Sequence, residues 1–229
     1  MRACAINLGG YLMKTQMRFQ KYICLAVLIT SVLALAYAFC YMSGGLNELS
    51  YVIDSKNNSI FKAGDGYNDA TLYLDIQGFN DTLMYCGIVM IVLSVLLYIT
   101  ACNSRRNYYI TNYVATGVCA GGNIVMSLVL MIMNGMWLGE YLNIDFEAWE
   151  KHNNEIKEFY ELIGEKVPKD AIYSSDPSIG WFVVGFIVYF LVIVACVLLI
   201  LNLVWKIKLM QGEKKLLNGA NTVEGGEAV

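Results

Sequence analysis

The amino-acid sequence predicts an all-α polytopic membrane protein, with four transmembrane helices and a small α+β extracytoplasmic cap. Of its 229 residues, 57% are hydrophobic. Four apolar runs reach about 20 residues, which is the length that a helix needs to cross ~30 Å of hydrocarbon. The runs cover residues 22–42, 83–102, 110–136 and 181–204, and none contains Asp, Glu, Lys, Arg or His. Proton-coupled carriers and voltage sensors use ionisable groups inside the membrane, so both classes are disfavoured.

The distribution of charge predicts how the helices are oriented. Basic residues lie before the first run, between the second and third, and after the fourth: Arg2, Lys14, Arg18, Lys21, Arg105, Arg106, Lys206, Lys208, Lys214 and Lys215. Both long connections carry an excess of Asp and Glu. Because cytoplasmic connections are enriched in Lys and Arg, we expect both termini in the cytoplasm, both long loops outside, and the protein in the plasma membrane.

This orientation gives the predicted organisation in chain order. It consists of a cytoplasmic N-terminal segment (1–21), the first transmembrane helix (22–42), an extracytoplasmic loop with short β-strands (43–82), the second helix (83–102), a cytoplasmic turn (103–109), the third helix (110–136), an extracytoplasmic loop with an amphipathic helix (137–180), the fourth helix (181–204) and a cytoplasmic tail with a disordered end (205–229). The tripeptide Ala36-Tyr37-Ala38 is similar to a signal-peptidase site. However, the run is long for a signal sequence, so we expect the first helix to be retained.

The two long loops predict the cap. Residues 71–77 alternate apolar and polar side chains with period two, which indicates a strand, and residues 50–54 and 59–62 are weaker strands. In the second loop, residues 145–164 carry apolar side chains at three- and four-residue spacing and predict a helix that ends at Gly164. Its apolar face is expected to cover the sheet, with binding of a partner as the alternative.

The third run stands out because it carries a regular polar stripe. On a helical wheel its polar residues fall within an arc of roughly 60°. They are Asn112, Thr116, Asn123, Ser127 and Asn134. Nearly opposite lies a helix-packing stripe of small residues, Gly117, Gly121, Gly135 and Gly139, and a valine-rich sector suited to lipid separates the two. Glycine at such spacing lets another helix approach closely. A ridge of small residues on the first helix, at positions 26, 30, 34 and 38, is one expected neighbour of the glycines.

Two interpretations of the polar stripe remain open. Amides and hydroxyls in hydrocarbon need hydrogen-bond partners. Those partners are either neighbouring helices, which makes the stripe an assembly feature, or water and a solute, which makes it a polar track.

The sequence predicts neither catalytic, nor cofactor-binding, nor metal-binding residues. None of the seven cysteines lies in the long loops, no Cys/His cluster occurs, and His152 is the only histidine. Four helices with a strand-bearing first loop resemble the claudin layout. That family's paired outside cysteines and Trp-Gly-Leu signature are absent here, because residues 43–81 contain no Cys or Trp. Tetraspanins also need outside cysteines, so no family is assigned.

Three functions are therefore carried forward. The first is a non-catalytic integral membrane protein, an accessory or oligomeric subunit that assembles through the third helix and the cap. Its partners would be the lipid bilayer and either further copies of itself or another membrane protein. The second is a pore or transporter component with a polar track on the third helix. The third is a membrane enzyme acting on a lipid-linked substrate, with Asp81, Glu140 and Asp176 as candidate carboxylates. Nucleic-acid binding is not indicated, because topology explains the few basic residues.

Overall fold

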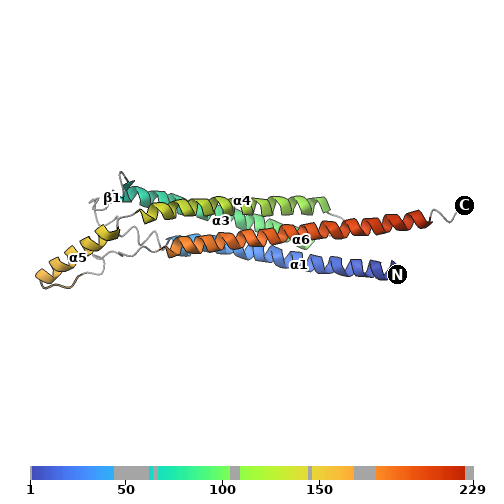
Figure 1. Ribbon diagram of the computed structural model, residues 1–229, viewed down its shortest axis with the longest axis horizontal. Helices are drawn as coiled ribbons and strands as arrows, with labels where there is room; N and C mark the ends of the chain where they lie inside the picture. The colour runs from blue at the N-terminus through green and yellow to red at the C-terminus, as the bar shows by residue number, and fades with distance from the viewer. Residues whose placement is uncertain are drawn as a thin grey trace. The chain divides into compact units, whose positions relative to one another are not determined.

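A computed structural model describes residues 2–43, 62–63, 67–103, 109–143, 146–167 and 179–224. Helices dominate these residues (Figure 1). In chain order the elements are α1 (Arg2–Ala36), the π-helix η1 (Tyr37–Met42), β1 (Lys62–Ala63), β2 (Tyr67–Asn68), α3 (Asp69–Asn103), α4 (Tyr109–Leu142), α5 (Phe146–Leu162) and α6 (Gly180–Glu224).

Four of the described helices are long and apolar enough to cross a membrane, which confirms the predicted multi-pass helical class. The candidate spans are Tyr11–Met42, Asp75–Thr100, Tyr113–Leu142 and Gly180–Gly212. Each contains or overlaps one of the predicted runs, but the helices extend well beyond them. Helix α1 already begins at Arg2, and α6 continues to Glu224, through part of the tail that was predicted to be disordered.

The predicted small α+β cap is not supported. Among the described residues, β1 and β2 hold two residues each and pair antiparallel, with Lys62 opposite Asn68 and Ala63 opposite Tyr67. Residues 71–77, predicted as the main strand, belong to α3 instead. Extending a helix that is already nucleated fixes one residue for each hydrogen bond gained, whereas an isolated strand gains none without a partner. The predicted strand at 50–54 lies outside the described residues.

The helix predicted in the second long loop is confirmed as α5. Gly164 follows it with a φ of +70°, and its N–H donates to Glu161 O at 3.2 Å, while the N–H of Glu165 donates to Tyr160 O at 3.1 Å. This left-handed glycine ends the helix as expected. Phe159 and Leu162 are 59% and 85% exposed, so the described residues leave part of the helix's apolar surface uncovered.

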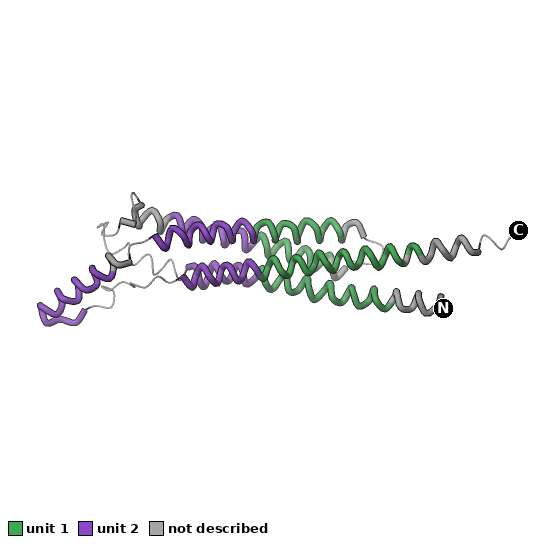
Figure 2. Tube along the Cα trace, in the orientation of Figure 1, with its two compact units in different colours: residues 1–31, 89–126, 191–229 green, residues 32–88, 127–190 purple. Residues whose placement is uncertain are grey.

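The chain forms two compact units, and each of the four long helices contributes to both (Figure 2). Unit 1 comprises Met1–Ser31, Val89–Met126 and Leu191–Val229, and unit 2 comprises Val32–Ile88 and Ser127–Phe190. The core of unit 1 includes the buried side chains of Cys24, Val27, Leu97, Ala120 and Leu199. The core of unit 2 includes those of Ala34, Leu83, Leu130, Phe182 and Tyr189.

Candidate functional site

The polar stripe of α4 faces the interior of the protein. The side chains of Thr116 and Asn123 are buried in unit 1, and those of Ser127 and Asn134 are buried in unit 2. The side chain of Asn112 lies outside the described residues. The opposite sector is open, since each of its apolar residues is between 48% and 65% exposed: Val114, Val118, Val125, Val129, Ile132 and Met136.

In unit 1 the stripe joins a cluster of small polar side chains from three helices. Asn123 Nδ2 on α4 donates to Ser94 Oγ on α3 at 3.2 Å. The Ser94 hydroxyl also shares a 2.8 Å hydrogen bond with Ser31 Oγ on α1. Each serine is anchored to its own helix, because Ser94 Oγ lies 2.7 Å from Met90 O and Ser31 Oγ lies 2.8 Å from Val27 O. Ser94 is therefore the centre of a hydrogen-bonded contact between α1, α3 and α4.

In unit 2 the stripe joins α4 to η1 and α6 through a tyrosine. The Tyr37 hydroxyl donates to Asn134 Oδ1 at 3.2 Å, and Asn134 Nδ2 donates to the Phe182 carbonyl oxygen at 2.8 Å. The ring of Tyr37 packs edge-on against Tyr189, with centroids 6.0 Å apart. Both the Oδ1 and the Nδ2 atom of Asn134 thus have a hydrogen-bond partner on another helix.

Gly185 on α6 makes room for this tyrosine. A Cβ at Gly185 would lie 2.6 Å from the Tyr37 hydroxyl oxygen and 2.7 Å from its Cζ. Real Cβ atoms do not approach other atoms that closely, so any larger residue would displace the ring. Periodicity along the fourth apolar run gives no sign of this partner.

Some buried polar atoms keep no partner among the described residues. In unit 1 this holds for Asn123 Oδ1, and in unit 2 for Ser127 Oγ and the Tyr189 hydroxyl oxygen. An unpaired polar atom in an apolar interior costs free energy. These atoms are the positions at which a water molecule would be accommodated most favourably.

Three of the four stripe glycines of α4 have open space around them within the described chain. A Cβ on Gly117, Gly121 or Gly139 would meet no heavy atom of the described chain within 4 Å, and one on Gly135 would come only within 3.6 Å of Phe186 Cζ. The expected ridge of the first helix is not seated there. Instead, α1 approaches Gly87 of α3, where a Cβ would lie 3.1 Å from Leu35 Cα.

Two of the three carboxylates considered for an enzyme lie among the described residues. Asp81 is exposed, Glu140 is half-buried, and Asp176 lies outside the described residues. Among the residues that can be placed, no group of three or more His, Cys, Asp or Glu side chains is arranged to hold a metal ion.

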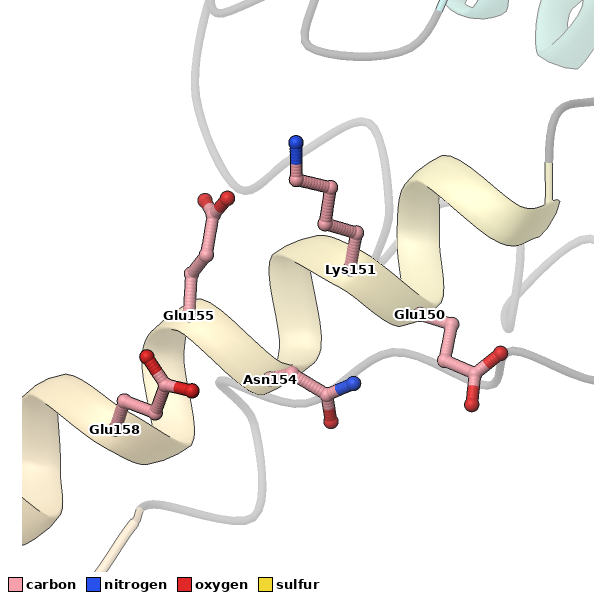
Figure 3. A pocket seen from close by; sticks show the side chains of 5 residues that line it. All are labelled: Glu150, Lys151, Asn154, Glu155 and Glu158. Atoms are coloured by element: carbon pink, nitrogen blue, oxygen red, sulfur yellow. The ribbon is translucent and has the colours of Figure 1, made fainter.

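A shallow depression lies on α5 and is lined by Glu150, Lys151, Asn154, Glu155 and Glu158. Figure 3 shows Lys151 and Glu155 extending from one side of the helix, and Glu150 and Asn154 from the other. Because these side chains do not converge on a common point, the depression is the open surface of a solvated helix.

Sequence reasoning missed a polar cluster between α1 and α6 in unit 1. Gln16, Asn202 and Lys206 are 0%, 6% and 4% exposed. Gln16 Nε2 lies 3.4 Å from Gln20 Oε1 and 3.5 Å from the Asn202 carbonyl oxygen. The residues before position 22 were interpreted only as a basic flank. The available signal was the four-residue spacing of Gln16 with Gln20 and of Asn202 with Lys206, which places each pair on one helix face.

Comparisons with models of protein families, with curated proteins and with solved structures give no match for this chain.

Proposed function

We propose that this chain is a non-catalytic integral membrane protein that self-associates through the outward glycine face of α4 and acts as an oligomeric or accessory subunit of a membrane complex. The observation that carries the proposal is the contrast between the two faces of α4. Its polar side chains contact other helices of the same chain, whereas Gly117, Gly121 and Gly139 have no described neighbour within 4 Å.

The open glycines need an explanation that lies outside the chain. Glycine in a helix interior is less favourable than alanine by about 0.8–1 kcal/mol in water. A Cβ added at Gly87, Gly122 or Gly185 would lie close to other atoms of the chain, at 3.1, 3.3 and 2.6 Å respectively. Gly117 and Gly121 have no such neighbour, yet they form a small-xxx-small pair, the spacing that lets two transmembrane backbones approach. A second copy of α4 supplies the missing neighbour without requiring any other protein.

The contacts of the polar stripe support assembly over transport. Asn134 has partners for both its Oδ1 and its Nδ2 atom, and Asn123 donates to Ser94. Hydrogen bonds of this kind join helices by roughly 0.6–2 kcal/mol each. A polar track would instead require these amides to be available to a solute.

The test is an association measurement in lipid vesicles. Donor- and acceptor-labelled chains should show energy transfer that falls as lipid dilutes the protein. Replacing Gly117 and Gly121 together by Leu fills the open face, where a Cβ would meet no heavy atom of the described chain within 4 Å. It should weaken association by at least tenfold, which corresponds to about 1.4 kcal/mol. The matched control replaces the exposed Val114 and Val118 by Leu on the neighbouring sector and should associate like wild type. A wild-type chain that shows no energy transfer above random proximity even at the highest protein-to-lipid ratio, or equal association of both double variants, would contradict self-association through this face.

We further propose that both termini are cytoplasmic in the plasma membrane, on the basis of the charge distribution. In a background without cysteines, Lys14→Cys should resist a membrane-impermeant thiol reagent added to intact cells. Glu158→Cys, exposed on α5, should react. Labelling of Lys14→Cys but not of Glu158→Cys would show the opposite topology.

A further inference from the structure

The polar cluster of unit 1 combines a buried lysine with buried hydrogen-bonding atoms that have no partner among the described residues. Asn202 and Lys206 lie one turn apart on α6, and Gln16 of α1 rests against Asn202, with its Nε2 3.5 Å from the Asn202 carbonyl oxygen. Gln16 Oε1 and Asn202 Nδ2 are buried and have no hydrogen-bond partner among the described residues. The cluster therefore offers two kinds of donor, an amide and an ammonium, together with one free acceptor.

The described residues of unit 1 supply almost no negative charge. They contain two acidic residues, Glu213 and Glu224, both towards the end of α6. The nearer one, Glu213, lies two helical turns beyond Lys206, a separation of about 10 Å along the axis. Lys14, Arg18, Lys21 and Lys208 are exposed on the same two helices and add further positive charge. An anion is therefore the natural partner of Lys206.

The level of the cluster along the helices points to a membrane lipid. Lys206 follows directly after the apolar run 181–204, and Gln16 and Gln20 precede the run 22–42. Beside them the rings of Phe19 and Trp205 pack with centroids 6.4 Å apart, and both rings are exposed. Tryptophan is enriched where the hydrocarbon meets the headgroups, so we expect this cluster at headgroup depth.

We propose that Gln16, Asn202 and Lys206 bind the headgroup of an anionic phospholipid. The phosphate accepts hydrogen bonds from Asn202 Nδ2 and from the Lys206 ammonium group, while a hydroxyl of the headgroup donates to Gln16 Oε1. Phosphatidylglycerol combines this charge with such hydroxyls, whereas phosphatidylcholine has neither a net charge nor a headgroup donor. Basic pockets between transmembrane helices are suited to anionic headgroups. This site is separate from the proposed self-association face, because its residues belong to α1 and α6.

The experiment uses the full-length protein in a neutral detergent, with native mass spectrometry to count retained lipids and thermal unfolding as a second measure. Phosphatidylglycerol should be retained with one molecule per chain and should raise the unfolding midpoint, and phosphatidylcholine should do neither. Lys206→Met should weaken retention at least tenfold. The matched control Lys208→Met removes the same charge from an exposed position of the same helix and should stay within about twofold of wild type.

Three outcomes would overturn the proposal. Equal retention of the two lipids by the wild-type protein would show that the headgroup is not recognised, whatever the folding of the variants. Equal losses in Lys206→Met and Lys208→Met would show that net charge attracts the lipid without a site. A midpoint shift by soluble glycerol phosphate as large as that by phosphatidylglycerol would identify a free phosphate ester, and not a lipid, as the ligand. If Lys206→Met does not fold, Asn202→Ala replaces it, with the same loss expected.

Discussion

The two units use the same polar stripe of α4 in different ways. In unit 1, Asn123 donates to Ser94, and the hydroxyl groups of Ser94 and Ser31 bridge α3 and α1 at 2.8 Å. In unit 2, Asn134 meets the phenol of Tyr37, and Gly185 leaves the space that the ring occupies. The side-chain amide of Asn123 thus bonds to a short side chain. That of Asn134 bonds to a long side chain, for which a glycine leaves room. The neighbouring helices decide which solution each unit adopts.

The most damaging change expected is Gly185→Ala in unit 2. Its Cβ would lie 2.6 Å from the Tyr37 hydroxyl, and the ring cannot swing aside easily, because it is buried against Tyr189 and bonded to Asn134. We expect a loss of about 3 kcal/mol in the free energy of unfolding, at the upper end for overpacking. Unfolding in detergent would measure it, with Gly139→Ala, which meets no neighbour, as the control. If the two variants are equally stable, Gly185 is not required for the tyrosine contact.

A smaller loss is expected from Ser94→Ala in unit 1. This change removes the hydrogen bond that Asn123 Nδ2 donates, beside an Oδ1 atom that already lacks a partner, at a cost of about 2 kcal/mol. Ser31→Ala should cost roughly half as much, because Ser94 still binds Asn123 and the Met90 carbonyl oxygen. Equilibrium unfolding of both variants ranks them, and a larger loss in Ser31→Ala would mean that Ser94 is not the centre of the cluster.

Tyr37→Phe tests the hydrogen bond of unit 2 without creating a clash. It removes the donor to Asn134 Oδ1 but keeps the ring, so we expect a loss of about 1 kcal/mol. The exposed Tyr41 in the same unit provides the control, since Tyr41→Phe should leave stability unchanged. Asn134→Leu should add little further loss in the Tyr37→Phe background if the two groups act as a pair. Fully additive losses would argue against that coupling.

The smallest effect distinguishes two adjacent glycines of unit 1. A Cβ at Gly122 would lie 3.3 Å from Leu93 Cδ1, the end of a flexible side chain, whereas one at Gly121 would meet nothing. Gly122→Ala should therefore cost under about 0.5 kcal/mol, and Gly121→Ala should be neutral or slightly stabilising for the monomer. Thermal unfolding in detergent checks the order, and destabilisation by Gly121→Ala alone would place an unseen neighbour on that face.

Apolar run length predicted the four long helices, because the membrane demands about 20 apolar residues and internal hydrogen bonding. The helical wheel also predicted which residues of α4 share a face, and the structure places Asn123 and Asn134 inside and Val118 and Val129 outside. Both results follow from constraints that act along one helix.

Features that depend on contacts between helices escaped prediction. Nothing in the local sequence connects Gly185 to Tyr37 or Gln16 to Asn202, since each pair is distant along the chain. The segment 71–77 has a strand-like alternation, but its junction with a long apolar helix lets α3 extend through it. The sequence indicated a packing stripe of glycines on α4. Periodicity along one helix does not tell whether the helix that packs there belongs to this chain or to another.

The π-helical turn at Tyr37–Met42 makes the contacts of unit 2 depend on the number of residues in this segment. Hydropathy does not reveal this dependence. The residue after it, Ser43, donates to Ala38 O at 2.9 Å and accepts from Asn80 Nδ2 of α3 at 3.3 Å. Removing one residue from positions 39–41 would leave the run long enough to span the bilayer. It would, however, change the rotation of Met42 and Ser43 about the helix axis, because a π-helical turn holds more residues than an α-helical turn and tightens when one is lost. The Ser43 hydroxyl would then no longer face Asn80. Deleting a single residue here would therefore change the hydrogen-bonded contact between this segment and α3.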